Sequence, residues 1–152
     1  MKLKLIIMAV LSLGCLSVTK NVVLLNWPDM AGLNYETGAM TPLLKENTNK
    51  VVELKGFIVP LELDGYIEEV KEFLLVPDPM ACIHVPPPPP NQLVHVKMKE
   101  SIPLDMDFRG VAIQGTLTVI ESNNLFGYEM AGMSATEADI EFDDSFYEWP
   151  PM

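Results

Sequence analysis

Five consecutive prolines restrict what the middle of this chain can fold into: Pro86, Pro87, Pro88, Pro89 and Pro90. Because proline has no backbone N–H, such a run cannot occupy a central strand of a sheet. It adopts the polyproline II helix, and at about 3.1 Å per residue it predicts a stiff rod roughly 15 Å long. Asn91 and Gln92 follow, with side chains able to bond carbonyl groups that the rod leaves unpaired. We therefore predict a rigid, exposed connection between two strands.

The sequence on both sides of the prolines alternates between apolar and polar residues, which predicts β-strands. The alternation is clearest over residues 51–60, 93–98 and 110–121. A further strand is expected at 72–77, closed by Pro77, and a short fifth strand at 128–132. Gly56 and Gly115 lie within two of these strands, where glycine is typical of a bend or bulge. Five short strands with little helix predict a mainly β fold, a small five-stranded OB-like barrel, with an open β-sandwich as the alternative.

The rest of the chain divides around this β domain, which we place at residues 51–133. Residues 21–50 are rich in Pro, Gly and Asn, so we expect a loop-rich lead-in with one helical turn, anchored by Trp27 and Leu33. Residues 134–152 form an acidic tail. Ser134 and Glu137 have the spacing of a capping box, which predicts a short helix at its start.

Residues 1–20 are typical of an export signal. Lys2 and Lys4 precede an apolar run too short to span a bilayer. The run ends in a sequence similar to the lipobox of bacterial lipoproteins, with Ser12 where leucine is usual, so cleavage is expected before Cys15, which would carry lipid. An ordinary cleaved signal and a retained membrane anchor are the alternatives. All three place the domain outside the cytoplasm, and we predict a membrane-anchored lipoprotein in the periplasm of a Gram-negative bacterium.

The charge of the chain excludes one class of partner. The formal net charge is −11, and no Lys or Arg follows Arg109. An acidic protein is repelled by phosphate backbones and by anionic lipid surfaces. We therefore expect no nucleic-acid partner.

The scarcest reactive residues stand next to the prolines. If Cys15 is lipidated or removed, Cys82 is the one thiol of the mature domain and cannot form an internal disulfide. Cys82 and His84 point to the same side of an extended chain, which is half of a zinc site. Pairing of the strands that flank the prolines would bring His95 back toward them as a third ligand. His95 should point outward, because its neighbours Val94, Val96 and Met98 form an apolar row.

The remaining ligand and the metal stay open. A carboxylate such as Glu62 or Glu129, or water, would be the fourth ligand. Zinc is the expected metal, and copper is a less favoured alternative because Met80 would add a thioether to the set. The simpler alternative is that Cys82 is a buried small apolar residue and each histidine a structural one.

Enzymatic activity has little support in the sequence. The chain contains no P-loop, dinucleotide fingerprint, H-E-x-x-H, C-x-x-C or G-x-S-x-G motif. Cys82 and His84 could form a nucleophilic pair oriented by Asn91, but nothing else indicates a substrate pocket. We expect a non-catalytic protein and name no catalytic residue.

Three segments, KGFIVPLE, FLLVPDPMACIHVPPPPPNQ and FRGVAIQGTLTV, together resemble an uncharacterised family of small bacterial periplasmic proteins and lipoproteins, classed as a domain of unknown function. The resemblance covers residues 51–132, and Cys82, His84, Asn91 and Gln92 match its Cys-x-His-x-polyproline-Asn-Gln signature. It implies an OB-like fold, and some members lie alongside zinc-responsive uptake or export systems. This chain departs from the pattern in its lipobox and in the acidic tail after Gly132.

Together these features predict a periplasmic, lipid-anchored, zinc-binding accessory protein of an envelope metal-handling or transport system. The alternative is a non-catalytic interaction module that docks on an envelope transporter through the prolines, Asn91 and Gln92. Either function gives the chain a protein partner in the envelope.

Overall fold

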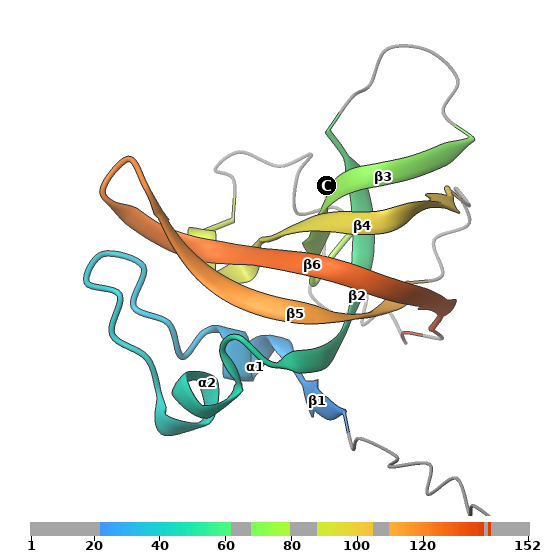
Figure 1. The fold of residues 1–152 in the computed structure, drawn as a ribbon. Coiled ribbons are helices and arrows are strands. Elements are labelled where there is room, and N and C mark those ends of the chain that lie inside the picture. The colour runs from blue at the N-terminus through green and yellow to red at the C-terminus, as the bar shows by residue number, and fades with distance from the viewer. Residues whose placement is uncertain (1–21, 62–67, 80–87, 105–109, 139, 141–152) are drawn as a thin grey trace, which may run out of the picture.

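The computed structural model describes residues 22–61, 68–79, 88–104, 110–138 and 140. Figure 1 shows a strongly curved sheet with two short helices at one end. The strands are β1 (Val23–Leu25), β2 (Val51–Pro60), β3 (Glu69–Val76), β4 (Val94–Pro103), β5 (Val111–Ser122) and β6 (Leu125–Glu137). The helices are α1 (Trp27–Met30), α2 (Pro42–Asn47) and the short 3₁₀ helix η1 (Pro90–Gln92).

Five of the six strands close into a ring. The strand order is β1-β2-β3-β4-β6-β5, and β2 also pairs with β5. β2 can serve two neighbours because its first part, Val51 to Gly56, pairs with β5 and its second part, Phe57 to Pro60, pairs with β3. β4 and β6 run parallel, while the other pairs of the ring are antiparallel. This confirms the predicted mainly β, OB-like fold over the open sandwich.

Both central glycines mark the irregularities that the sequence predicts. Gly56 is the residue at which β2 changes partner, and a Cβ atom there would lie 2.6 Å from the Val76 carbonyl oxygen. Gly115 lies at a register shift between β5 and β6, where Met133 is the extra residue of β6. A Cβ atom on Gly115 would lie 2.5 Å from the Ala131 carbonyl oxygen. Glycine is needed at both points because the neighbouring backbone approaches so closely.

The inside of the ring is filled by the apolar residues that alternate along its strands. Fully buried side chains come from every strand of the ring, and they include Leu54, Phe73, Val96, Ile113 and Met130. The outer positions between them carry the polar side chains. Four buried side chains of the lead-in pack against this core: Leu25, Met30, Leu33 and Leu44. The core is therefore shared between the ring and the lead-in.

The lead-in is more regular than its composition predicts. β1 pairs in parallel with β2, an element that the sequence analysis missed. α1 begins at a capping box in which the Asn26 side chain accepts from the Asp29 N–H at 2.8 Å and the Asp29 carboxylate accepts from the Asn26 N–H at 3.0 Å. The predicted anchors are confirmed, since Leu33 is fully buried and Trp27 packs against the core.

The prediction of a helix that begins at Ser134 is wrong for the described residues 134–137. Residues 134–137 continue β6, and Ser134 pairs with Gln114 while Glu137 pairs with Val111. A capping box stabilises only the first turn of a helix. Here the backbone groups of these residues are satisfied instead by the neighbouring strand β5, which local sequence cannot reveal.

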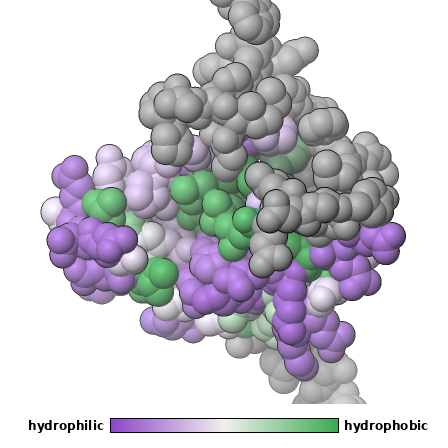
Figure 2. Space-filling view, turned by 90° about the horizontal axis from the view of Figure 1, so that it is seen from above, coloured by the Kyte–Doolittle hydropathy of each residue, from purple (hydrophilic) through white to green (hydrophobic). Residues whose placement is uncertain are grey.

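Among the described residues, no helix is long and apolar enough to cross a membrane. Seen from above, the surface is largely hydrophilic, with hydrophobic residues gathered near its middle (Figure 2). The predicted signal and the lipidated Cys15 lie outside the described residues and stay predictions.

Candidate functional site

Four charged or titratable side chains meet on the outer face of β3, β4 and β6: Glu72, His95, Lys97 and Glu129. The strand registers place them together, because Glu72 pairs with Lys97 and His95 pairs with Glu129. Their alternation with the buried Val94, Val96 and Met98 turns them outward, so the predicted orientation of His95 is confirmed. In OB-folds the face of the second and third strands, with two loops beside it, binds oligonucleotides and oligosaccharides, and the corresponding strands here are β3 and β4.

His95 lies between two carboxylates. Its Nε2 atom is 2.7 Å from Glu72 Oε1, and its Nδ1 atom is 3.9 Å from Glu129 Oε2. The side chain of His95 is 29% exposed, so part of the imidazole ring lies at the surface. When Nε2 carries the proton, it donates to Glu72 and leaves Nδ1 as a free lone pair that faces Glu129.

Lys97 completes the cluster on the other side of Glu129. Its Nζ atom donates to Glu129 Oε2 at 2.9 Å. This hydrogen bond and the charge of Glu129 raise the pKa of Lys97 above its usual value. Glu129 therefore faces a cation in the structure, and the same carboxylate oxygen is the one nearest the histidine ring.

The cluster can contribute part of a metal site but not a whole one. In metal sites, a carboxylate commonly accepts from the second ring nitrogen of a ligating histidine, as Glu72 does here. Zinc bonds of about 2.0–2.2 Å at tetrahedral angles separate two ligand atoms by about 3.4 Å, which is close to the 3.9 Å between His95 Nδ1 and Glu129 Oε2. Within the described parts of the chain, however, no group of three or more His, Cys, Asp or Glu could hold a metal ion.

The other predicted ligands lie outside the described residues. These are Cys82 and His84, and the same applies to Met80, Glu62, Pro86 and Pro87. Whether Cys82 and His84 meet His95 thus stays a prediction. Glu72 and Lys97 are the residues of the cluster that the sequence analysis missed. For Glu72 the contact with His95 is the clearer case. The signal that could have found it is the register between β3 and β4, which places Glu72 two residues from the partner of His95.

The described end of the proline run turns into the domain. Pro89 has the polyproline II angles φ −66° and ψ 157°, but Pro90 starts the 3₁₀ helix η1, so the predicted rod of five residues is wrong at its last position. The fixed φ of proline suits the first turn of a helix. The Gln92 N–H closes this turn on the Pro89 carbonyl at 2.8 Å, and η1 contacts β6 and α1.

Asn91 and Gln92 fasten this end of the connection to the lead-in. Asn91 Nδ2 donates to the Leu33 carbonyl at 2.9 Å and to the Ala31 carbonyl at 3.4 Å. Gln92 Nε2 donates to the carbonyls of Asn91 at 3.1 Å and Trp27 at 3.4 Å. The two side chains bond backbone carbonyls, as predicted. The prediction that these carbonyls belong to the prolines is wrong, because most of them belong to the lead-in. The proposal that this connection docks on a transporter stays a prediction.

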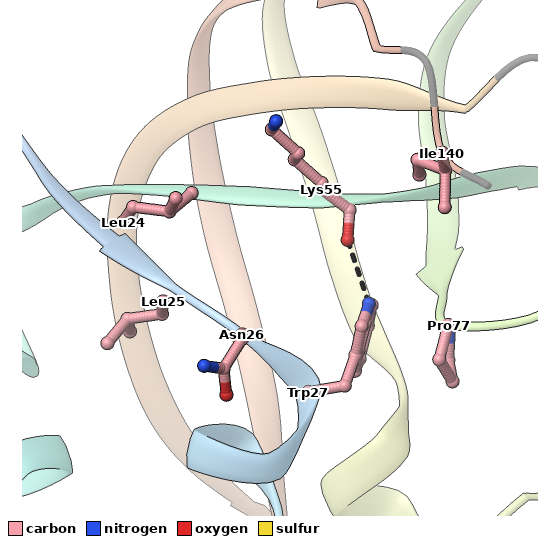
Figure 3. A pocket seen from close by; sticks show the side chains of 7 residues that line it. All are labelled: Leu24, Leu25, Asn26, Trp27, Lys55, Pro77 and Ile140. Atoms are coloured by element: carbon pink, nitrogen blue, oxygen red, sulfur yellow. Dashed lines mark hydrogen bonds between the residues drawn. The ribbon is translucent and has the colours of Figure 1, made fainter.

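A groove that the sequence did not indicate lies beside β1 (Figure 3). Its volume is about 320 Å³, and its lining is apolar apart from two side chains. The lining residues are Leu24, Leu25, Asn26, Trp27, Lys55, Pro77 and Ile140. The indole Nε1 of Trp27 donates to the backbone carbonyl of Lys55 at 2.8 Å, which fixes the ring against β2.

Comparison with known proteins gives one family. A family model described as "Protein of unknown function (DUF3299)" matches residues 30–140. The chain is also similar to the crystal structure of a DUF3299 family protein from Pseudomonas aeruginosa PAO1, with 26% sequence identity and a TM-score of 0.58. That similarity covers 80% of this chain and 99% of the other. No curated protein matches the chain. The family match extends beyond residues 51–132 on both sides, so it includes most of the lead-in.

Proposed function

Because the chain belongs to DUF3299, a family of proteins of unknown function, its own residues are the guide to its activity, and we propose that it is a non-catalytic zinc-binding domain. The observation that carries the proposal is the position of His95 between Glu72 and Glu129 on the outer face of β4. A histidine whose one nitrogen is held by a carboxylate and whose other nitrogen faces a second carboxylate resembles a zinc ligand with its supporting partner.

The full ligand set combines the two strands with the β3–β4 connection. His95 and Glu129 supply a nitrogen and an oxygen, and Cys82 and His84 supply a sulfur and a second nitrogen. Four ligands of these types suit tetrahedral zinc. Glu72 orients His95 without touching the metal.

The connection begins and ends at β3 and β4, two of the strands that carry this face. Leu75 pairs with Val94, so the segment that carries Cys82 leaves and returns beside His95. Cys82 follows Pro79 by three residues, which can span at most about 10 Å. The other end of the segment is held by Asn91 and Gln92. A segment fixed at both ends loses less conformational entropy when it closes over an ion.

Lys97 has a defined part in this proposal. Without zinc, its ammonium group neutralises Glu129. Zinc at His95 Nδ1 would take the same carboxylate oxygen, so binding would release Lys97 to solvent. Binding is then an exchange of one cation for another, which makes it sensitive to ionic strength.

The proposed location and partner rest on features of the sequence alone. The charged N-terminus, the apolar run and Cys15 support export and lipid attachment in the periplasm. We propose that the domain serves an envelope metal-handling or transport system, whose zinc it would bind beside the membrane. The net charge of −11 favours attraction of metal cations to its surface.

Elemental analysis of the purified mature protein tests the proposal. After equilibration with zinc under reducing conditions and removal of loosely bound metal, we expect one zinc per chain. Cys82→Ser, His84→Ala, His95→Gln and Glu129→Gln should each lose most of it. Glu100→Gln is the matched control, because Glu100 is an exposed carboxylate further along β4 and outside the cluster.

Two results would contradict different parts of the proposal. Zinc that is absent, or unchanged in Cys82→Ser and His84→Ala, would overturn the metal function. Zinc that is lost in these two variants but retained in His95→Gln and Glu129→Gln would overturn the assignment of the strand ligands.

A further inference from the structure

The groove beside β1 has an apolar surface, and Lys55 is one of its lining residues. Leu24 is 56% exposed, and Trp27 is only half-buried although it packs against the core. Lys55 is exposed, and it makes no ion pair within the described part of the chain. The surface is therefore complementary to a segment that carries both apolar and acidic side chains.

One segment of this chain starts at the groove itself. Ile140 is one of the lining residues, and its side chain packs against Gly110, where a Cβ atom would clash with it. The Ala138 N–H donates to the Gly110 carbonyl at 2.8 Å, so the backbone just before Ile140 is held as well. The chain that follows leaves from a fixed point on the wall of the groove.

The composition of that following chain matches the groove. Residues 141–152 contain four aromatic side chains, namely Phe142, Phe146, Tyr147 and Trp149. They also contain four carboxylates and no Lys or Arg. Twelve residues can extend to about 40 Å, far more than a groove of this size requires.

We propose that residues 141–152 dock in the groove of the same chain, with aromatic side chains against Leu24 and Trp27 and a carboxylate on Lys55. The covered surface would otherwise be an exposed apolar patch next to β1, whose outer edge carries no strand partner among the described residues. An open strand edge beside apolar side chains favours unwanted association, so a tail that covers it protects the monomer. This docking does not depend on zinc binding.

The two tryptophans of the sequence allow a direct test, because one lies in the groove and the other in the tail. In the full chain with Trp149→Phe, fluorescence reports on Trp27 alone, and acrylamide measures its exposure. Further replacement of Phe142, Phe146 and Tyr147 by serine should raise the quenching constant about twofold, because the uncovered face of a half-buried ring becomes open to the quencher. Leu125→Ser in the same background is the control, since Leu125 is an exposed apolar residue on the β5–β6 hairpin.

The charge contact is tested separately. Lys55→Glu should also raise the quenching of Trp27, whereas Lys45→Glu, the same charge change on α2, should not. The hydrogen bond from Trp27 goes to the backbone of Lys55, so the side-chain change leaves it in place.

Equal quenching with and without the tail aromatics would overturn the proposal. Protection of Trp27 that grows with protein concentration would also overturn it, because the groove would then be filled by a second copy.

Discussion

The Nε2 atom of His95 lies 2.7 Å from Glu72 Oε1 on the neighbouring strand, and this contact turns the other ring nitrogen toward Glu129. Glu72 and His95 are 23 positions apart in sequence. The contact exists because β3 and β4 pair in a register that sets Leu74 opposite His95 and Glu72 opposite Lys97. Glu72 is thus the residue that orients the imidazole.

If His95 ligates zinc, Glu72→Gln should weaken zinc binding about 10- to 100-fold. The Glu72 carboxylate would orient the imidazole ring and make the ligating nitrogen of His95 more basic, and the variant loses both effects. The number of zinc ions bound at saturation should stay the same. Competition with a chromophoric chelator measures the affinity, and Glu100→Gln gives the comparison for loss of one exposed carboxylate. If Glu72→Gln binds zinc as tightly as the unchanged protein does, Glu72 does not support a zinc ligand.

Gly115→Ala should destabilise the domain by about 2 kcal/mol, because an added methyl group in a tightly packed interior forces the backbone apart. The nearest atom to that group would be the Ala131 carbonyl oxygen at 2.5 Å. Gly127→Ala on β6 is the matched control, since its nearest neighbour would be Pro90 Cβ at 3.9 Å. Urea denaturation of the two variants should give clearly different midpoints, and similar midpoints would argue against a rigid bulge at Gly115.

Asn91→Ala should lower the free energy of unfolding by about 1 kcal/mol, since the part-buried bond from Asn91 to the Leu33 carbonyl is lost. Amide hydrogen exchange should accelerate in residues 31–40, because the bonds from Asn91 to Leu33 and Ala31 hold that part of the lead-in. Gln114→Ala is the comparison, because its bond to Glu53 lies within the sheet. Exchange rates in residues 31–40 that do not change would show that other contacts hold the lead-in.

Tyr128 links the stability of the domain to alkaline pH. Burial raises the pKa of Tyr128 well above its ordinary value of about 10, and its hydroxyl donates to the Met30 carbonyl at 2.7 Å. Above pH 10 the unfolded chain loses this proton while the folded protein keeps it, so the stability from this group is complete below pH 10 and declines above it. The raised pKa of Lys97 acts in the same direction.

Urea denaturation between pH 8 and pH 11 checks this dependence. The free energy of unfolding should fall by up to about 1 kcal/mol per pH unit above pH 10 because of Tyr128. Tyr128→Phe should be less stable at pH 8 by about 1 kcal/mol, because the Met30 carbonyl loses the 2.7 Å hydrogen bond from Tyr128 and keeps the longer one from the Leu33 N–H at 3.3 Å. The variant should also show a shallower decline at high pH. An equal slope in both proteins would mean that Tyr128 ionises normally in the fold.

The sequence predicts the ring well because its strands carry a clear alternation. The expected alternation of buried and exposed residues is present in residues 51–55 and 94–98, and the outward position of His95 follows from its buried neighbours Val94 and Val96. The roles of Gly56 and Gly115 are predictable because a glycine inside a strand usually marks a bulge, a bend or a close backbone approach. These features depend on residues a few positions apart.

The errors arise where distant segments decide the outcome. Ser134 and Glu137 carry a helix signal, but β5 offers their backbone a full set of partners. Asn91 and Gln92 bond carbonyls of residues 27–33, which are about sixty positions away in sequence. The Glu72–His95 contact and the groove at Trp27 likewise require the strand registers. Periodicity does not contain this information.

The pairing of β2 with β5, which closes the ring, also limits how fast this protein can fold. Val51 pairs with Thr116, so β2 cannot complete its hydrogen bonds until β5 has been synthesised and brought back to it. Proteins dominated by such non-local pairings fold slowly, in milliseconds to seconds. If the chain is exported, as we propose, this delay would favour translocation, since the ring could not close until β5 had been synthesised.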